Sequence, residues 1–337
     1  MKKLSMVAIS VAAALTSQAY ASEVGQFDVS VYGKVGATTQ TNQDTAGVPT
    51  LDTRTDEDFD GYQDSKLGVK IGYGINSQLS VQSEIKGDFE GKEEQSRIQE
   101  LYLQAQSGAY ELQVGRMTTP VYMDSQSVSD DFALHSYRGV RGFSVEDTAL
   151  ESIDGVSISL DTNVGGHETV LRAYTGETDG RIQGSFDESK GETTTTTTDA
   201  KNVWGLEAKM ATQYGHFRAS HIEAEVDEVT FRNTSLDYSV THGMTFVDAS
   251  VSKEDSKNVE YKKGFVTVGA EFGKLTPSVT YSRIDADSDS VEDTETVELG
   301  LAYQVSTDFK LKTAYEHVDY ETSKSAEVFS LGAAFRF

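Results

Sequence analysis

The sequence has no cysteine, only 3 prolines and far fewer bases than acids among its 337 residues. Without cysteine, a disulfide framework, a thiolate nucleophile and a cysteine-ligated metal are all excluded. The 29 Lys and Arg against 54 Asp and Glu leave a net charge of −25. This excess of acid disfavours a nucleic-acid partner, because binding to phosphates needs a basic surface.

Long hydrophobic runs are also missing. Past the first 15 residues, none approaches the roughly 18 residues that a membrane-spanning helix needs, which excludes a helical membrane protein. The N-terminus carries Lys2 and Lys3, an apolar stretch from Leu4 to Leu15, and the small-x-small sequence Ala19-Tyr20-Ala21. This pattern predicts a cleaved signal peptide over residues 1–21. An N-terminal anchor is the alternative, but the apolar stretch is too short to span a membrane.

What the chain does have is alternation with a period of two. Apolar residues occupy every second position in many segments, most clearly in 27–37, 67–73, 79–85, 297–305 and 329–337. Such half-apolar segments of about ten residues are typical of tilted strands that cross a bilayer. The other face of these strands is polar, whereas the inner faces of a soluble sandwich pack into a dry core. The pattern therefore favours a membrane barrel with a wet interior.

The expected connections alternate between short and long, as they do in membrane barrels. The short ones fall near 74–77, 106–109, 214–215, 242–243, 273–274 and 306–307, and the long ones cover 39–62, 90–95, 117–136, 176–201, 226–233, 253–261, 286–294 and 321–324. A literal count of strands is odd, and only an even number places both chain ends on one side. We therefore merge Val156 to Thr175, interrupted at Gly165-Gly166, into one strand. The prediction is an all-β, 16-stranded antiparallel transmembrane β-barrel over residues 22–337.

Specific strings resemble the general trimeric porins of Gram-negative outer membranes, the general diffusion porin family. They are Val31-Tyr32-Gly33-Lys34 for the "YGK" motif, 64–70 for "DSRLGFKG", Gly115-Arg116 with Pro120 and Tyr122 for "GR...P.Y", Ser129-Asp130-Asp131-Phe132 for the end of the third loop, and the terminal Ala334-Phe335-Arg336-Phe337. The similarity is dense from residue 27 to about 145 and again in the last strand. Between these regions only the alternation matches.

The resemblance implies a water-filled channel that is narrowed by an inward-folded third loop and that passes small hydrophilic solutes and ions. Carried over by position, a ladder of bases on the wall (Lys34, Lys66, Arg97, Arg138) faces acidic residues on the loop (Asp124, Asp130, Asp131). Alternation independently places Lys34 and Lys66 on the polar face, and places Arg138 opposite the apolar phase of Phe143 and Val145. The strand of Arg97 alternates poorly, and a register shift of two residues would put Gln99 in its place. Each of these bases could instead be a plain solvated wall charge.

The resemblance also implies partners: a homotrimer, outer-membrane lipid and lipopolysaccharide, and the assembly machinery of the outer membrane. Arg116 shares the outward phase of Leu112 and Val114, so we expect it at a subunit contact. Phe337 resembles the terminal aromatic residue that the assembly machinery reads. No cofactor and no metal are predicted.

Two features shape the expected conduction. The segment Met117 to Ser129 is shorter than the third loop of the family, so we expect a wider constriction. Acids gather in the expected outer loops, at 52–60 and 285–295. Because they concentrate cations over about one Debye length, roughly 8 Å at physiological salt, we expect a modest preference for cations.

Other functions find less support in the sequence. His135-Ser136 near Asp130 and Asp131 could serve a barrel phospholipase, but adjacent residues on a strand point apart. Asp285, Asp287 and Asp289 copy half of a calcium loop, yet Ser290 replaces its glycine and Thr296 its final Glu. Specific uptake of a sugar, or a secreted structural β-protein, remain alternatives that no motif favours.

Overall fold

The computed structural model describes residues 25–41, 65–88, 95–122, 137, 140, 142–143, 150–182, 186–187, 192–193, 196–226, 228–256, 259–288, 292–321 and 325–337. Regular structure in these residues is β-strand throughout. In the same ranges, no helix is long and apolar enough to cross a membrane. The predicted signal peptide lies outside the described residues and stays a prediction.

Sixteen strands form one closed wall. They are β1 (Phe27–Thr41), β2 (Lys66–Asn76), β3 (Leu79–Asp88), β4 (Gln95–Ser107), β5 (Tyr110–Thr118), β6 (Ser152–Val164), β7 (His167–Ile182), β10 (Thr196–Thr212), β11 (Gly215–Val226), β12 (Val229–His242), β13 (Thr245–Ser256), β14 (Val259–Ala270), β15 (Leu275–Ala286), β16 (Thr294–Ser306), β17 (Phe309–Tyr320) and β18 (Ala326–Arg336). The short strands β8 (Phe186–Asp187) and β9 (Glu192–Thr193) pair with each other in the connection between β7 and β10.

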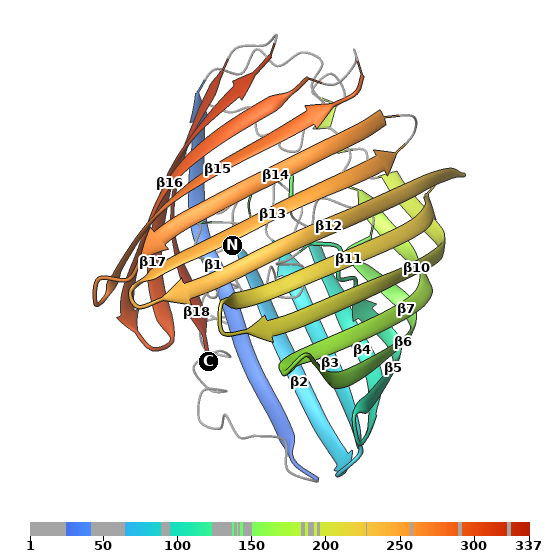
Figure 1. Cartoon of the computed structure of the whole chain (residues 1–337). Helices are drawn as coiled ribbons and strands as arrows, with labels where there is room; N and C mark the ends of the chain where they lie inside the picture. Colours follow the sequence, from blue (N-terminus) through green and yellow to red (C-terminus); the bar gives the residue numbers. More distant parts are fainter. Residues whose placement is uncertain are drawn as a thin grey trace.

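The wall closes where the first strand meets the last (Figure 1). β1 pairs antiparallel with both β2 and β18. Beyond the end of β18, the backbone N–H and C=O of Phe337 exchange hydrogen bonds with Val31, at 2.7 and 2.8 Å. A closed sheet has no edge, so every strand finds backbone partners on both sides, which a bilayer demands. The predicted 16-stranded antiparallel barrel is confirmed.

Two details of the strand prediction are wrong. One predicted strand is in fact two and another does not form, so the predicted total of 16 is still correct. The merged segment is two strands, β6 and β7, joined by a tight turn in which Gly165 and Gly166 have φ of +62° and +88°. Glycine adopts these angles without strain, so the pair makes a hairpin instead of an interruption. The expected strand through Arg138 and Val145 does not form at its described residues, since Val140, Gly142 and Phe143 are not in a strand.

The two faces of the wall have opposite character. Outward apolar side chains are exposed, for example Leu236 and Val251, each at 58%. Between them, inward polar side chains such as Asn233 and Ser235 are fully buried. Exposed apolar surface costs roughly 25 cal/mol per Å² in water, so a continuous outer belt of this kind is stable only against lipid.

The two ends of the barrel also differ. One end carries only tight turns, such as those between β2 and β3, β4 and β5, and β6 and β7. At the other end, β1 to β2 and β5 to β6 are joined by long connections. Two predicted long connections, 226–233 and 253–261, are wrong. There β11, β12, β13 and β14 run on as paired strands with outward charged side chains, and two residues complete each link.

Candidate functional site: the interior of the barrel

The connection from β5 to β6 runs from Thr119 to Glu151, and its described residues lie inside the barrel. At its start, Arg218 on β11 donates to the carbonyl oxygen of Pro120 at 2.5 Å, and Ser220 donates to that of Val121 at 3.1 Å. The inward fold of the third connection is therefore present. The expected short loop ending at Ser129 is wrong, because no strand forms at the described residues until Ser152.

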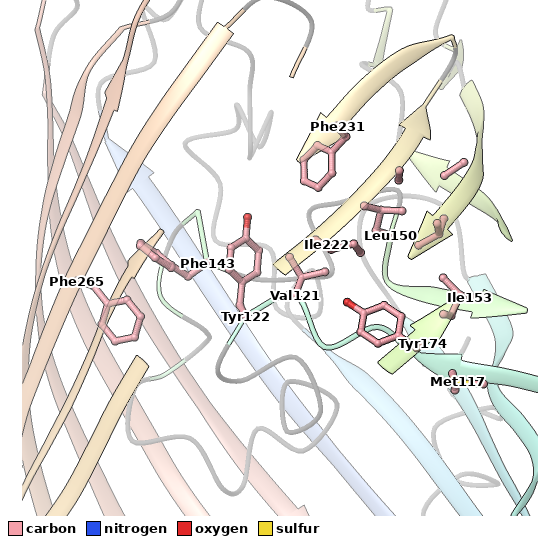
Figure 2. Close-up of a cluster of buried hydrophobic side chains, with 13 residues drawn as sticks. Met117, Val121, Tyr122, Phe143, Leu150, Ile153, Tyr174, Ile222, Phe231 and Phe265 are labelled. Atoms are coloured by element: carbon pink, nitrogen blue, oxygen red, sulfur yellow. The ribbon is translucent and has the colours of Figure 1, made fainter. Parts of the chain in front are cut away.

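Apolar side chains of this connection pack against the inner wall (Figure 2). The cluster consists of Met117, Val121, Tyr122, Phe143, Leu150, Ile153, Tyr174, Ala200, Val203, Ile222, Ala224, Phe231 and Phe265. Phe143, which we expected to share the outward apolar phase of a strand, is 4% exposed inside the barrel. Its phase was misread because the chain is not extended there. The wall members of this cluster lie on β5, β6, β7, β10, β11, β12 and β14.

Two predicted bases lie in register on neighbouring strands. Lys34 on β1 pairs with Lys66 on β2, and both lie in the inward phase of their strands. The ammonium nitrogen of Lys34 lies 4.6 Å from the ring centroid of Tyr137, a favourable cation–π distance. The hydroxyl of Tyr137 donates to the carbonyl oxygen of Leu331 on β18 at 3.2 Å. The connection therefore reaches the wall at the junction of β1 and β18.

The third predicted base, Arg97, points inward and pairs with the connection. Its Nη2 lies 2.7 Å from Glu151, and the ammonium of Lys86 lies 3.5 Å from the same carboxylate. A β-bulge explains the poor alternation of β4, because Glu100 and Ile98 oppose consecutive residues of β3 while Gln99 is skipped. The bulge leaves Arg97 and Gln99 both on the inner face.

Other charged residues of the inner wall were not predicted as site residues. Lys70 lies 3.7 Å from Glu84, which also accepts a hydrogen bond from the hydroxyl of Tyr32. Gly68 makes room for the ring of Tyr32, since a Cβ there would lie 2.0 Å from a ring carbon. Alternation is compatible with the inward position of Lys70, Glu84 and Lys86, because each lies in the phase opposite to the apolar residues of its strand, but it does not say which of them pair. The wall beside Lys34 therefore carries acid as well as base.

The most enclosed of these charge groups centres on Arg218, which has 6% of its side chain exposed. Its guanidinium lies 2.6 Å from Glu207 on β10 and 2.6 Å from Asp237 on β12. Charged hydrogen-bonding groups are stable in such surroundings only when they are fully partnered. With its bond to Pro120, this network ties three wall strands to the connection. Arg218 was not predicted as a site residue, and its partner Pro120 is too distant in sequence to be predicted.

Several predicted site residues lie outside the described residues. These are Arg138 of the basic ladder, Asp124, Asp130 and Asp131 of the acidic loop, and the His135-Ser136 pair of the phospholipase alternative. The structure thus brings Lys34 and Lys66 together, and it places Arg97 on the same inner wall, two strands from Lys66.

Two predicted outer residues are described. Arg116 on β5 faces outward and forms a two-pronged ion pair with Asp154 on β6, with N–O distances of 2.9 and 2.5 Å. Phe337 is 40% exposed, and the centroid of its ring lies 5.7 Å from that of Phe335. Both features belong to the outer surface, away from the lumen.

Solved structures with this architecture include three outer-membrane proteins. DcaP of Acinetobacter baumannii, an outer membrane channel, is 13% identical, with a TM-score of 0.63 over 94% of this chain and 100% of that chain. The anion-selective porin from Comamonas acidovorans is 12% identical, with a TM-score of 0.62 over 93% and 100%. The trimer form of OmpT from Vibrio cholerae is 15% identical, with a TM-score of 0.58 over 94% and 100%. At such identities the likeness shows the fold.

The family is shown by the sequence itself. No curated protein matches the chain significantly. The family model described as Gram-negative porin, however, matches residues 8–336. That match agrees with the closed barrel, the polar inner wall and the inward connection. The chain therefore belongs to the Gram-negative porins, outer-membrane channels through which small hydrophilic solutes and ions diffuse passively.

Proposed function

We propose that the channel is narrowest where Lys34, Lys66, Arg97 and Arg138 face Asp124, Asp130 and Asp131. The inward phase of Lys34 and Lys66, in register on adjacent strands, supports this assignment most directly. A transverse field between a basic wall and an acidic loop orients dipolar solutes and disfavours apolar ones, so the channel filters by size and polarity without a binding pocket. The function is that of a channel and not of an enzyme.

The proposed ion preference is modest and for cations. The net charge of −25 and the acids in the long connections support it, because an acidic mouth concentrates cations. Reversal potentials measured in a KCl gradient test the proposal. We expect the potential to have the sign of K⁺ permeation and to shrink as salt screens the mouth. A potential of the opposite sign would overturn the preference.

Replacing the wall bases tests the constriction. Lys34→Gln with Lys66→Gln should raise cation selectivity further, because two positive charges leave the narrowest part of the pore. Lys274→Gln, in an exposed turn at the other end, is the matched control and should leave selectivity unchanged. Equal effects of both changes would remove Lys34 and Lys66 from the constriction.

The predicted wide constriction has lost its basis, since the third connection extends to Glu151. Its width stays a prediction that single-channel conductance decides. A conductance above that of ordinary family members supports a wide passage, and one at or below it contradicts that prediction.

We further propose that the protein is a homotrimer and that Arg116 contacts a neighbouring subunit. The outward ion pair with Asp154 supports this, since an ionised pair at the outer surface is better placed against protein than against acyl chains. We expect Arg116→Leu to weaken the SDS-resistant oligomer, seen as dissociation at a lower temperature on unheated gels. An oligomer as resistant as that of the parent chain would remove Arg116 from the contact.

Lipid and assembly partners complete the proposal. The exposed apolar belt faces lipid, and the acidic outer connections contact lipopolysaccharide phosphates through divalent cations. EDTA should then strip lipopolysaccharide from the purified protein, and retention after EDTA would contradict that bridging.

We also propose that residues 1–21 are removed on export and that Phe337 is read during assembly. A mature N-terminus other than Ser22, or normal assembly of Phe337→Ala, would contradict these two assignments.

A further inference from the structure

The two limbs of the β5–β6 connection meet at one point of the wall. Tyr122 belongs to the outgoing limb, and Gly142 to the returning one. The ammonium nitrogen of Lys263 on β14 lies 3.2 Å from the hydroxyl oxygen of Tyr122 and 3.2 Å from the carbonyl oxygen of Gly142. It also lies 2.8 Å from Glu254 on β13. One side chain thus holds both limbs.

The chemistry of this contact is complete. An ammonium group has three donors and no acceptor, and here each donor finds one oxygen. The hydroxyl of Tyr122 accepts from Lys263 and donates to Glu254 at 2.9 Å, which closes a triangle of hydrogen bonds. Lys263 and Glu254 have only 11% and 12% of their side chains exposed. Hydrogen bonds with ionised partners in such surroundings are stronger than bonds between neutral groups.

Aromatic rings pack beside the contact, with Phe143 between Phe265 and Tyr122 (Figure 2). Phe143 packs edge-on against Phe265 of β14, with centroids 4.8 Å apart, and against Tyr122, with centroids 5.8 Å apart. Gly142 has a φ of +76°, and a Cβ there would lie 2.4 Å from the side chain of Ile284. Only glycine therefore presents its carbonyl to Lys263 at this close approach. The returning limb is shaped to fit the wall.

Between the two limbs the chain reaches another part of the barrel. Tyr137 contacts Lys34 on β1 and Leu331 on β18, and β15, β16 and β17 separate these strands from β14. The connection therefore contacts the wall at Lys263 through Tyr122, at β1 and β18 through Tyr137, and at Lys263 again through Gly142. We call the segment between these contacts the arch, and we call Tyr122 and Gly142, which both contact Lys263, its two feet.

We propose that Lys263 and Glu254 are positioning residues that clasp the two feet of this arch and so hold the passage at a fixed width. The inference rests on the channel function proposed above. With the clasp in place, the arch is tied at β13–β14 and at β1–β18. Without it, the far contact at Tyr137 remains, and Pro120 and Val121 stay bonded to Arg218 and Ser220. The returning foot at Gly142, however, loses its hydrogen bond to the wall and gains freedom, and the current through the open channel fluctuates.

The strands themselves supply matched controls for the test. Lys262 precedes Lys263 on β14 but faces outward, with 70% of its side chain exposed, and Asp255 follows Glu254 on β13 in the same outward phase. The test variants are Lys263→Met, Glu254→Gln and the milder Tyr122→Phe. The controls are Lys262→Met and Asp255→Asn, and Lys263→Arg keeps the charge.

The first measurement does not depend on conduction. The chain has no cysteine, so Val140→Cys, on the returning limb and partly buried against the apolar cluster, gives a single thiol for labelling by a polar maleimide in the folded protein. In Lys263→Met we expect labelling to accelerate about tenfold, the factor expected from the loss of one hydrogen bond to a charged group. Lys262→Met should label at the rate of the parent.

The second measurement is single-channel recording of the same variants. Lys263→Met should show about twofold or greater open-channel noise and should close at lower voltage, as expected for a segment freed at its base. Lys263→Arg should recover most of the parental behaviour, and Tyr122→Phe should fall between the two.

The outcomes separate the two proposals. If the parent conducts and Lys263→Met behaves as Lys262→Met does in both measurements, the clasp is refuted and the channel stands. If the parent fails to conduct while labelling still accelerates, the clasp stands and the channel function falls. If Lys263→Met does not fold, as shown by loss of heat-modifiable migration on gels, Tyr122→Phe tests the clasp instead. It removes only the hydroxyl oxygen that Lys263 contacts, and it must still accelerate labelling if the clasp exists.

Discussion

Among single residues, we expect the inward charged side chains to affect stability most, because the wall strands hold their charged partners in fixed positions. Arg218 neutralises Glu207 and Asp237 and at the same time holds the backbone of Pro120. An ion pair in such surroundings contributes little net stability when it is intact, but removing one partner leaves the other charges without compensation.

The substitution Arg218→Met tests this network. We expect it to lower the free energy of unfolding by about 3–5 kcal/mol, the usual cost of breaking a buried ion pair. Arg232→Met is the matched control, since Arg232 on the adjacent strand pairs with Glu223 at 2.8 Å on the outer face with 53% of its side chain exposed. This exposed pair should contribute little, so Arg232→Met should destabilise the protein much less than Arg218→Met does. Urea unfolding in lipid vesicles measures both, and equal costs would contradict the role of Arg218.

The strands and their connections show how much of the fold can be predicted from the sequence. A period of two is a local property, so the faces of strands such as β2, β12 and β16 could be read directly from the residues. The bulge that blurred β4 and the glycine turn between β6 and β7 depend on single backbone angles or register shifts, which alternation does not encode. Phe143 was misread because its partner Phe265 is brought near only by the closed barrel.

The candidate site also has features that could be predicted from the sequence and features that could not. The inward phase of Lys34 and Lys66 followed from alternation, and their order along the chain followed from resemblance to the family. The pairings Lys86–Glu151, Arg218–Pro120 and Lys263–Gly142 could not be predicted. Each joins the wall to the third connection, and no periodicity links residues that meet only once the barrel has closed.

The contact between Tyr137 of the third connection and Gly36 of β1 gives a prediction about how this element is held. Gly36 leaves space for Tyr137, because a Cβ there would lie 1.9 Å from the tyrosine hydroxyl. We expect Gly36→Ala to lower the free energy of unfolding by about 1–3 kcal/mol through overpacking. Gly264→Ala, where the nearest atoms to a Cβ lie 3.8 Å away, should stay within about 0.5 kcal/mol. If Gly36→Ala leaves the free energy of unfolding unchanged, Tyr137 does not lie against Gly36.

At the scale of the whole molecule, the scarcity of long apolar runs is resolved by the closed wall. Outward positions carry the apolar belt, inward positions carry charge, and neither face needs a continuous hydrophobic segment. The lumen is not uniform, since the apolar side chains of the third connection pack with inward residues of β7, β10, β11, β12 and β14. The proposed passage lies along the remaining wall, where Lys34, Lys66 and Arg97 stand.

The most direct test of a diffusion channel is planar-bilayer recording of the purified oligomer. We predict stepwise increases in conductance that grow in proportion to salt concentration, show no saturation by a solute, and carry a modest preference for K⁺ over Cl⁻. Insertion of correctly folded protein without any rise in conductance would contradict it.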